Sequence, residues 1–182
     1  YTLRLTVTDK DGDSGQDALL VSVANEPPTV SMQVDRAEIN EGESVEFTGA
    51  VSDQSEAPLR VSLDFDDNQS ESDITANFPY ADIVRLHTYV QEGTFQARLT
   101  ATDNDDETAD DTVVVMVHNV PPQVVLPDQT GTEGASINLV ASASDPGDDT
   151  LNYTWTFGDD TPAIQTQVAT VIPYFERFLA RL

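Results

Sequence analysis

Residues 1–30 and residues 95–124 carry closely related sequences, with no insertion or deletion between the two copies. The first copy reads YTLRLTVTDKDGDSGQDALLVSVANEPPTV, and the second reads FQARLTATDNDDETADDTVVVMVHNVPPQV. Leu5 therefore aligns with Leu99, and both copies end close to a Pro-Pro pair. Self-similarity at a fixed period, with a unit near the usual domain size, predicts units in series instead of one large core.

A second internal match shows where one unit begins and ends. Three segments recur: Glu41-Gly42 as Glu133-Gly134, Ser52-Asp53 as Ser144-Asp145, and LRVSLDFDDN at 59–68 as LNYTWTFGDD at 151–160. The repeat predicts three pieces: the C-terminal hairpin of a preceding unit (1–26), one complete unit (27–120), and the N-terminal part of a following unit (121–182) with an atypical tail at 172–182. We expect the chain to be a fragment of a longer protein, with both terminal units incomplete.

Apolar and polar residues alternate with period two along most candidate strands, which is typical of sheets with one buried face. Ala97, Leu99 and Ala101, for example, share one face of their strand. The expected strands cover residues 1–8, 19–23, 30–34, 44–51, 59–65, 73–78, 83–89, 95–102 and 113–117. About seven short strands per unit predict an all-β chain of immunoglobulin-like antiparallel sandwiches. The tail at 172–182 instead has apolar residues at helical spacing, which favours a short amphipathic helix or a segment foreign to the domain.

Two stretches carry a family resemblance. HTYVQEGTFQARLTATD at 87–103 and YTWTFGDDTP at 153–162 resemble the signature stretches of polycystic kidney disease (PKD) domains. The resemblance covers most of the chain, and it departs from the family pattern at Leu63, Asp66 and Thr156, where the family favours tryptophan, glycine and aspartate. It implies a β-sandwich from the extracellular part of a surface protein, or a module beside a secreted hydrolase.

The composition excludes one class of partner and favours another. The net charge is −25, from 33 acidic residues against 8 basic ones, and there is no cysteine. Nucleic-acid binding is excluded because it needs clustered lysine and arginine. Cations are the better candidates, and burial and metal ions remain as sources of stability. No apolar run reaches the ~20 residues of a membrane helix, so we expect membrane contact only through other parts of the parent protein.

Acidic loops supply the candidate functional residues. In a sandwich with this strand order, the B–C loop, the F–G loop and the entering linker lie at one end. Calcium prefers six to eight oxygen ligands, and carboxylates gathered at one end repel one another unless a cation is bound. The candidate calcium ligands are Asn25, Asp53, Glu56, Asp103 and Asp105 in the complete unit, Asp9, Asp11 and Asp13 in the first piece, and Asp145 in the third. The alternative is that Asp9 and Asp103 only cap tight turns, and that the acidic surface only keeps the protein hydrated.

The aromatic and histidine residues point to structure and not to catalysis. We expect Trp155 in the core of its unit, with sugar stacking as the alternative. His87 and Tyr89 are expected to be structural, with the tyrosine hydroxyl bonded to a backbone group. No set of nucleophile, base and orienting residue is visible, so an enzyme is not expected.

These observations favour a non-catalytic spacer or adhesion module at the cell surface or in the extracellular space, stiffened by calcium at unit junctions. Its partner would be a surface protein or a polysaccharide. The alternative is the accessory region of a secreted hydrolase, which holds a catalytic domain near a polymer. The incomplete end units also suggest a hypothesis of strand-complementing self-association, in which the hairpin at 1–24 completes the last unit of another molecule. Truncation of a longer product is the simpler explanation of the same ends.

Overall fold

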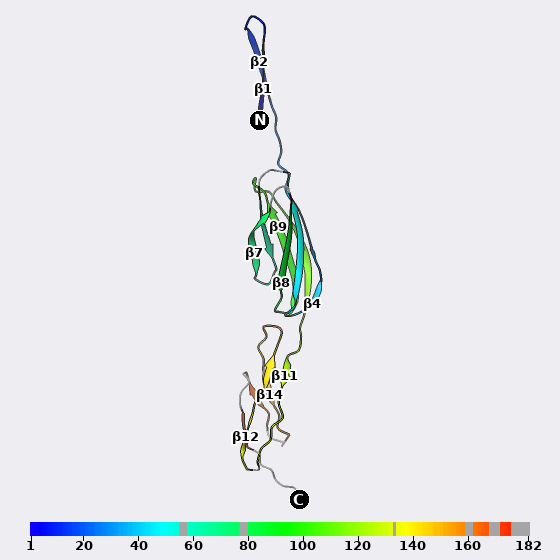
Figure 1. Cartoon of the computed structure of the whole chain (residues 1–182), viewed down its shortest axis with the longest axis vertical. Helices are drawn as coiled ribbons and strands as arrows, with labels where there is room; N and C mark the ends of the chain where they lie inside the picture. Colours follow the sequence, from blue (N-terminus) through cyan, green and yellow to red (C-terminus); the bar gives the residue numbers. More distant parts are fainter. Residues whose placement is uncertain (55–57, 77–79, 133, 159–161, 168–171, 176–182) are drawn as a thin grey trace.

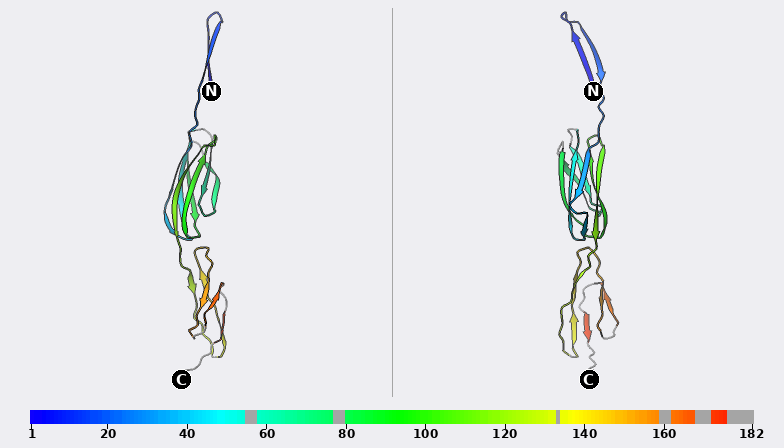
Figure 2. Two further views of the ribbon diagram at one scale, coloured as in Figure 1. Left: turned by 180° about the vertical axis from the view of Figure 1, so that it is seen from behind. Right: turned by 90° about the vertical axis from the view of Figure 1, so that its right-hand side faces the viewer.

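The computed structural model describes residues 1–54, 58–76, 80–132, 134–158, 162–167 and 172–175. All regular elements in these ranges are β-strands, and the sheets are almost wholly antiparallel, which confirms the all-β prediction. Three parts follow one another in a row: an N-terminal hairpin, a central sandwich and a C-terminal unit (Figure 1). The views in Figure 2 show the same elongated arrangement from two other sides. Within the described ranges, no helix is long and apolar enough to cross a membrane.

The N-terminal hairpin consists of β1 (Thr2–Thr8) and β2 (Ser14–Leu20), which pair antiparallel from Thr2 opposite Leu20 to Thr8 opposite Ser14. The second strand thus begins and ends earlier than the predicted 19–23. Apolar side chains of the hairpin stay in contact with solvent: Leu5 is 66% exposed, whereas its repeat equivalent Leu99 is 0% exposed. The sequence pattern is the same in both copies, but only Leu99 has a second sheet to pack against.

The central sandwich has two facing sheets. One sheet has the order β3-β5-β8, from β3 (Thr29–Val34), β5 (Ser44–Ser52) and β8 (Tyr80–Thr88). The other has the order β4-β10-β9-β6-β7, from β4 (Glu38–Asn40), β6 (Leu59–Asp64), β7 (Ser70–Ala76), β9 (Gly93–Thr102) and β10 (Thr108–His118). The sandwich architecture of the prediction is confirmed.

Within the central sandwich, strand β4 is the element that the sequence pattern does not predict. It has only three residues, too few to show alternation, and it pairs parallel with β10 through Ile39 opposite Val117. The short strand leads directly into the turn at Glu41 and Gly42, which lies at the end of the sandwich that meets the C-terminal unit.

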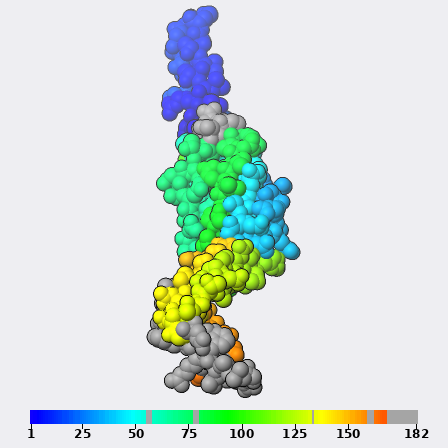
Figure 3. All heavy atoms as spheres, turned by 60° about the horizontal axis from the view of Figure 1, so that its bottom comes forward, coloured from blue at the N-terminus to red at the C-terminus, as the bar shows by residue number. Residues whose placement is uncertain are grey.

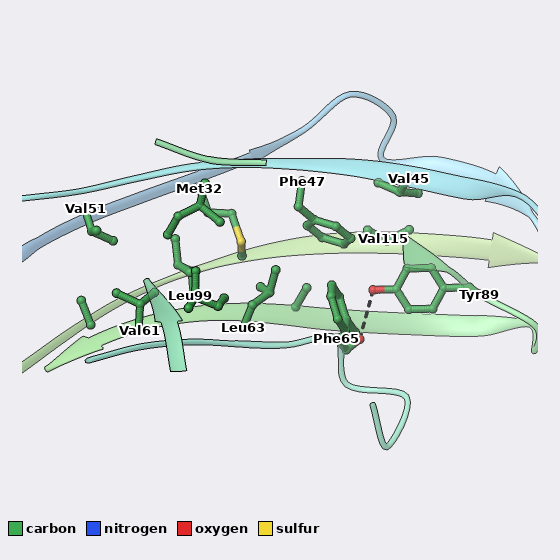
Figure 4. Packing of buried hydrophobic residues seen from close by; sticks show 14 of the residues in the cluster. Met32, Val45, Phe47, Val51, Val61, Leu63, Phe65, Tyr89, Leu99 and Val115 are labelled. Carbon is green, nitrogen blue, oxygen red and sulfur yellow. Dashed lines mark hydrogen bonds between the residues drawn. The ribbon is translucent and has the colours of Figure 1, made fainter. Parts of the chain in front are cut away.

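The core lies between the two sheets, and the predicted inward faces fill it (Figure 4). Val45 and Phe47 of β5 face Leu63 of β6 and Leu99 of β9, and all four side chains are at most 1% exposed. Gly49 lets the layers approach closely, because a Cβ at this position would lie 2.6 Å from Leu99 Cδ2. The position therefore has no room for a larger residue unless Leu99 moves.

The C-terminal unit is built from short paired strands. Its elements are β11 (Gln123–Val125), β12 (Ser136–Leu139), β13 (Ser142–Ser144), β14 (Tyr153–Trp155), β15 (Ile164–Thr166) and β16 (Ile172–Phe175). The pairs are β11 with β13, β12 with β16, and β14 with β15. Trp155 is 8% exposed and packs in a small core with Ala141, so its predicted core position is correct.

The tail contains one clear correction. A helix over 172–182 is wrong for its first part, because Ile172–Phe175 form strand β16 and pair antiparallel with β12. Apolar residues recur here at helical spacing, but the backbone groups of β12 offer a ladder partner, and pairing with them outweighs the local pattern. Residues 176–182 lie outside the described ranges.

Candidate functional site

The first junction lies where the linker after the hairpin enters the central sandwich. Three of the candidate ligands, Asn25 of the linker, Asp53 after β5 and Asp105 after β9, line one open pocket. The pocket is completed by Tyr1, Val23, Ala24, Glu26 and Gln54. The linker and the two loops thus come together at one end of the sandwich, as the strand order requires.

Asp103 stands at the centre of this junction but faces the protein. It is 2% exposed. One carboxylate oxygen, Oδ1, accepts hydrogen bonds from the backbone N–H groups of Asp105 and Glu107, each at 2.9 Å. The other, Oδ2, accepts a hydrogen bond from Asn25 Nδ2 at 2.7 Å. Asp103 therefore shapes the β9–β10 loop and fastens the linker to it.

The same hydrogen bonds set the charge state of Asp103. The hydrogen bond from Asn25 is the largest cause that lowers the pKa of this carboxyl below its ordinary value. Burial raises the pKa, but the backbone donors Glu107 and Asp105 and the positive charge of Arg60 lower it further. Asp103 is thus held as a carboxylate, because every partner of its side chain donates a hydrogen bond to the charged form.

Asp9 forms the equivalent turn in the hairpin. Its Oδ1 accepts hydrogen bonds from the backbone N–H groups of Asp11 and Asp13, each at 3.0 Å. Asp11 is also paired with Lys10 at 2.8 Å. This turn joins β1 to β2 at the tip farthest from the linker, so Asp9, Asp11 and Asp13 do not approach the ligands at the first junction (Figure 1). The turn-capping alternative describes the hydrogen bonds of both Asp9 and Asp103.

The remaining candidates lie elsewhere. Glu56 is outside the described residues. Asp145 belongs to the β13–β14 loop of the C-terminal unit, where its Oδ1 accepts a hydrogen bond from the backbone N–H of Gly147 at 2.9 Å. It lies at the second junction, where the C-terminal unit contacts the central sandwich (Figure 3).

The second junction is a direct contact between two units. The β13–β14 loop reaches the sandwich through Asp148, whose backbone N–H donates to Val90 O at 3.0 Å. The linker reaches it through Val120, whose backbone N–H donates to Glu41 Oε1 at 2.8 Å. Gly42 packs against Pro146, since a Cβ on Gly42 would lie 2.9 Å from Pro146 O.

Glu41 is the residue at this junction that sequence reasoning missed. It is 2% exposed although it lies in a turn, and its burial comes from contact with the next unit. The available signal was its recurrence as Glu133 in front of a glycine, which marked the repeat but gave no indication of burial.

The histidine and tyrosine of the HTY stretch form a packed structural cluster. Tyr89 Oη donates a hydrogen bond to Phe65 O at 3.0 Å (Figure 4), as predicted for a backbone partner. The His87 ring stacks on Phe65 with centroids 3.9 Å apart, and its Nε2 lies 2.7 Å from Asp67 Oδ2. Burial is the main cause that raises the pKa of Tyr89, and the charges of the nearby aspartates add to it. These stacked and hydrogen-bonded groups hold the sandwich together.

The chain was compared with known protein families and with solved structures. The family model described as PKD domain matches residues 25–117 and 119–174. Similar solved structures include the PKD domain of an M14-like peptidase from Thermoplasmatales archaeon SCGC AB-540-F20, at 21% identity and a TM-score of 0.47, over 52% of this chain and 98% of that one. Another is the PKD1 domain of Vibrio anguillarum Epp, at 21% identity and a TM-score of 0.40, over 54% of this chain and 100% of that one.

No curated protein matches the chain significantly. PKD domains are non-catalytic modules that generally belong to extracellular, surface or secreted proteins. The matched segments, the facing sheets and the recurring signature stretches lead to one conclusion: the chain belongs to the PKD domain family and carries its domains in tandem.

Proposed function

We propose that this chain is a non-catalytic spacer of an extracellular or cell-surface protein, in which successive PKD domains are held in a fixed line. The observation that carries the proposal is the docked second junction. There, the β13–β14 loop and the linker each donate a backbone hydrogen bond to the central sandwich, through Asp148 and Val120. A hydrogen bond from the linker and another from a loop of the next unit together oppose rotation between the units.

The linkers themselves add stiffness. Pro27-Pro28 and Pro121-Pro122 stand at the two junctions, and proline fixes φ near −65° and removes a backbone donor. Proline-rich connectors behave as semi-rigid spacers. Domains joined by such stiff linkers keep a nearly fixed spacing, which suits a stalk that projects another domain.

Calcium at the first junction is part of this proposal. Asn25, Asp53 and Asp105 line one pocket with Glu26, so oxygen-bearing side chains from the linker and both loops surround a common space. Their carboxylates are not gathered within 4.8 Å of one another, so an ion here would have to draw the loops together. Calcium accepts such mixed carboxylate, amide and backbone oxygens, and extracellular modules bind it with Kd of roughly 10⁻⁴ to 10⁻³ M. Asp103, with both carboxylate oxygens bonded within the protein, would position this site.

Two other functions are possible for such a module. One is adhesion to a surface protein or polysaccharide, and the other is an accessory role beside a secreted hydrolase. A row of exposed aromatic rings would favour polymer binding, because sugars stack on rings. In the described part of the chain, the strongly exposed aromatic side chains are those of Tyr1 and Tyr80, which belong to different parts of the molecule. The spacer role is therefore the better supported of these functions.

Small-angle X-ray scattering tests the spacer. The wild-type chain is compared with a variant in which Pro121-Pro122 is replaced by Gly-Gly. The wild type is expected to give the distance distribution of an extended particle, and the variant a broader distribution with a shorter mean. If both chains scatter as the same flexible ensemble, the fixed line of domains is disproved.

A further inference from the structure

Three carboxylates from two different domains meet at the second junction. Glu41 comes from the β4–β5 turn of the central sandwich, while Asp145 and Asp149 come from the β13–β14 loop of the C-terminal unit. One carboxylate oxygen from each residue lies within 4.8 Å of the others. Acidic residues gather in many places on a chain of this charge, so the cluster needs independent support.

That support comes from the burial of Glu41. Its side chain is 2% exposed, and Oε1 accepts a hydrogen bond from Val120 N. The second oxygen, Oε2, is buried and has no hydrogen-bond partner within the described part of the chain. Buried carboxylate oxygens are almost always paired, because their desolvation is otherwise uncompensated. A buried, unpaired oxygen on a residue that clusters with two further carboxylates indicates a missing positive partner.

The loop of the C-terminal unit is shaped around that oxygen. Gly147 lies directly against it: a Cβ at this position would be 2.5 Å from Glu41 Oε2 and 3.2 Å from Asp145 Oδ1. The absence of a side chain therefore lets the Glu41 carboxylate enter the loop beside Asp145. Gly42 has φ +79°, and a Cβ at this position would lie 2.9 Å from Pro146 O, so the contact with the next unit requires a glycine here.

The basic side chains that form ion pairs in the described ranges pair with carboxylates outside the cluster, and none of these ion pairs involves the three cluster residues. The chain as a whole has 33 acidic and 8 basic residues, so basic groups are scarce. A cation from solution is the partner that this composition favours.

The repeat extends this arrangement beyond one junction. Glu41-Gly42 recurs as Glu133-Gly134, and Ser52-Asp53 recurs as Ser144-Asp145. In the central sandwich, Glu41 lies at the end that meets the next unit and Asp53 at the end that meets the hairpin. The same pair of residues would face each other at every junction of a longer array.

We propose that Glu41, Asp145 and Asp149 bind one calcium ion that is shared between successive domains. Hard carboxylate oxygens suit this ion, and water and backbone oxygens complete its coordination. Because the ligands come from two domains, binding closes the junction as well as neutralising it. Asp145 holds in this site the repeat position that Asp53 holds at the first junction, and the site extends the spacer proposed above, on which it rests.

The test is calorimetric titration of the full 182-residue chain with CaCl₂ after removal of metals by a chelator. Glu41→Gln keeps the size of the side chain and removes its charge. Asp149→Asn is a second variant at an exposed position, where folding is least affected. Glu46→Gln, on the exposed face of β5, is the matched control with the same charge change in the same domain.

We expect the two cluster variants to lose one calcium site, with affinity reduced by at least about tenfold, because affinity follows the charge count of the ligands. Glu46→Gln should bind calcium as the wild type does. In chelator, Glu41→Gln should melt at or above the temperature of the wild type, because it removes a repelling charge. In calcium, the order should reverse, since only the wild type is stabilised by binding at this site. Calcium binding to Glu41→Gln with the number and affinity of wild-type sites overturns the proposal.

Scattering separates this inference from the spacer itself. If the wild type binds no calcium at Glu41 and still scatters as an extended particle, the shared ion is wrong and the spacer stands. If the calcium site is lost in Glu41→Gln but the wild type scatters as a flexible ensemble with calcium present, the site stands and the spacer is wrong.

Discussion

Leu99→Ala and Leu5→Ala place the same substitution at equivalent positions of the repeat, in two different environments. Leu99 is 0% exposed between the sheets of the central sandwich, and Leu5 is 66% exposed on the hairpin. Truncation of a buried leucine to alanine costs about 2 to 5 kcal/mol, and the cost is highest where the surroundings do not collapse into the cavity. A substitution on an exposed surface usually changes stability by less than about 0.5 kcal/mol.

The surroundings of Leu99 are rigid on the side where the cavity would form. A Cβ on Gly49 would lie 2.6 Å from Leu99 Cδ2, so the leucine packs directly on the backbone of β5. That backbone is paired on both edges, with Met32 opposite Gly49 on one side and Ile83 on the other. We therefore expect Leu99→Ala to lower the free energy of unfolding by about 3 to 5 kcal/mol, the upper part of the usual range.

Urea unfolding followed by far-UV circular dichroism measures both variants. Tryptophan fluorescence is unsuitable, because the single tryptophan, Trp155, belongs to the C-terminal unit and not to the sandwich. Each 1 kcal/mol also lowers the melting temperature of a domain of this size by about 4 to 8 °C. The reasoning fails if Leu99→Ala costs less than about 1 kcal/mol. It fails equally if Leu5→Ala costs as much as Leu99→Ala, because the hairpin would then be packed against something else.

Two further predictions concern the hydrogen bonds of buried groups. Tyr89→Phe should lower the free energy of unfolding by about 1 to 3 kcal/mol, because the buried carbonyl of Phe65 loses its hydrogen-bond donor. Tyr80→Phe is the control at an exposed tyrosine bonded to Asp82, and it should cost less than about 0.5 kcal/mol. Equal unfolding midpoints for the two variants would contradict this. Because the folded-state pKa of Asp103 lies below its ordinary value, its contribution to stability is present above about pH 4 and is lost as the pH falls through the folded-state pKa. Asn25→Ala removes the largest cause of that pKa shift. The urea midpoint of the variant should therefore fall less between pH 6 and pH 3 than that of the wild type. If the two midpoints fall by the same amount, Asn25 does not stabilise the Asp103 carboxylate.

Period-two alternation predicted the sandwich and its core because each face of a strand is decided locally. The side chains of Val45, Phe47 and Leu99 are buried as their phase requires. Local alternation does not say whether a second sheet is present. Leu5 has the phase of Leu99 but remains exposed. The difference in burial depends on whether strands from distant parts of the sequence form a second sheet above the residue.

The candidate ligands divide in the same way. Strand order alone brings Asn25, Asp53 and Asp105 to one end of the sandwich, and the sequence was sufficient to predict this. The sequence was not sufficient to decide whether Asp103 binds a cation or caps its turn. In the structure, two backbone donors within its own loop and the amide of Asn25 occupy its carboxylate oxygens. Whether an aspartate in a loop caps a turn or remains open to a ligand depends on a few dihedral angles that residue type does not fix.

Glu41 shows why contacts between repeats are the hardest feature to predict. Within a single unit it is a charged residue in a turn, which normally means exposure to solvent. Its burial results from the next unit, whose loop at Gly147 has no side chain where the carboxylate enters. A glutamate of one unit and a glycine of the next are complementary only when the units are joined, so the pair has no signature in either unit alone. A domain studied in isolation would present Glu41 and Asp145 as unrelated surface carboxylates, and the chemistry of the junction emerges only in a chain that contains both sides of it.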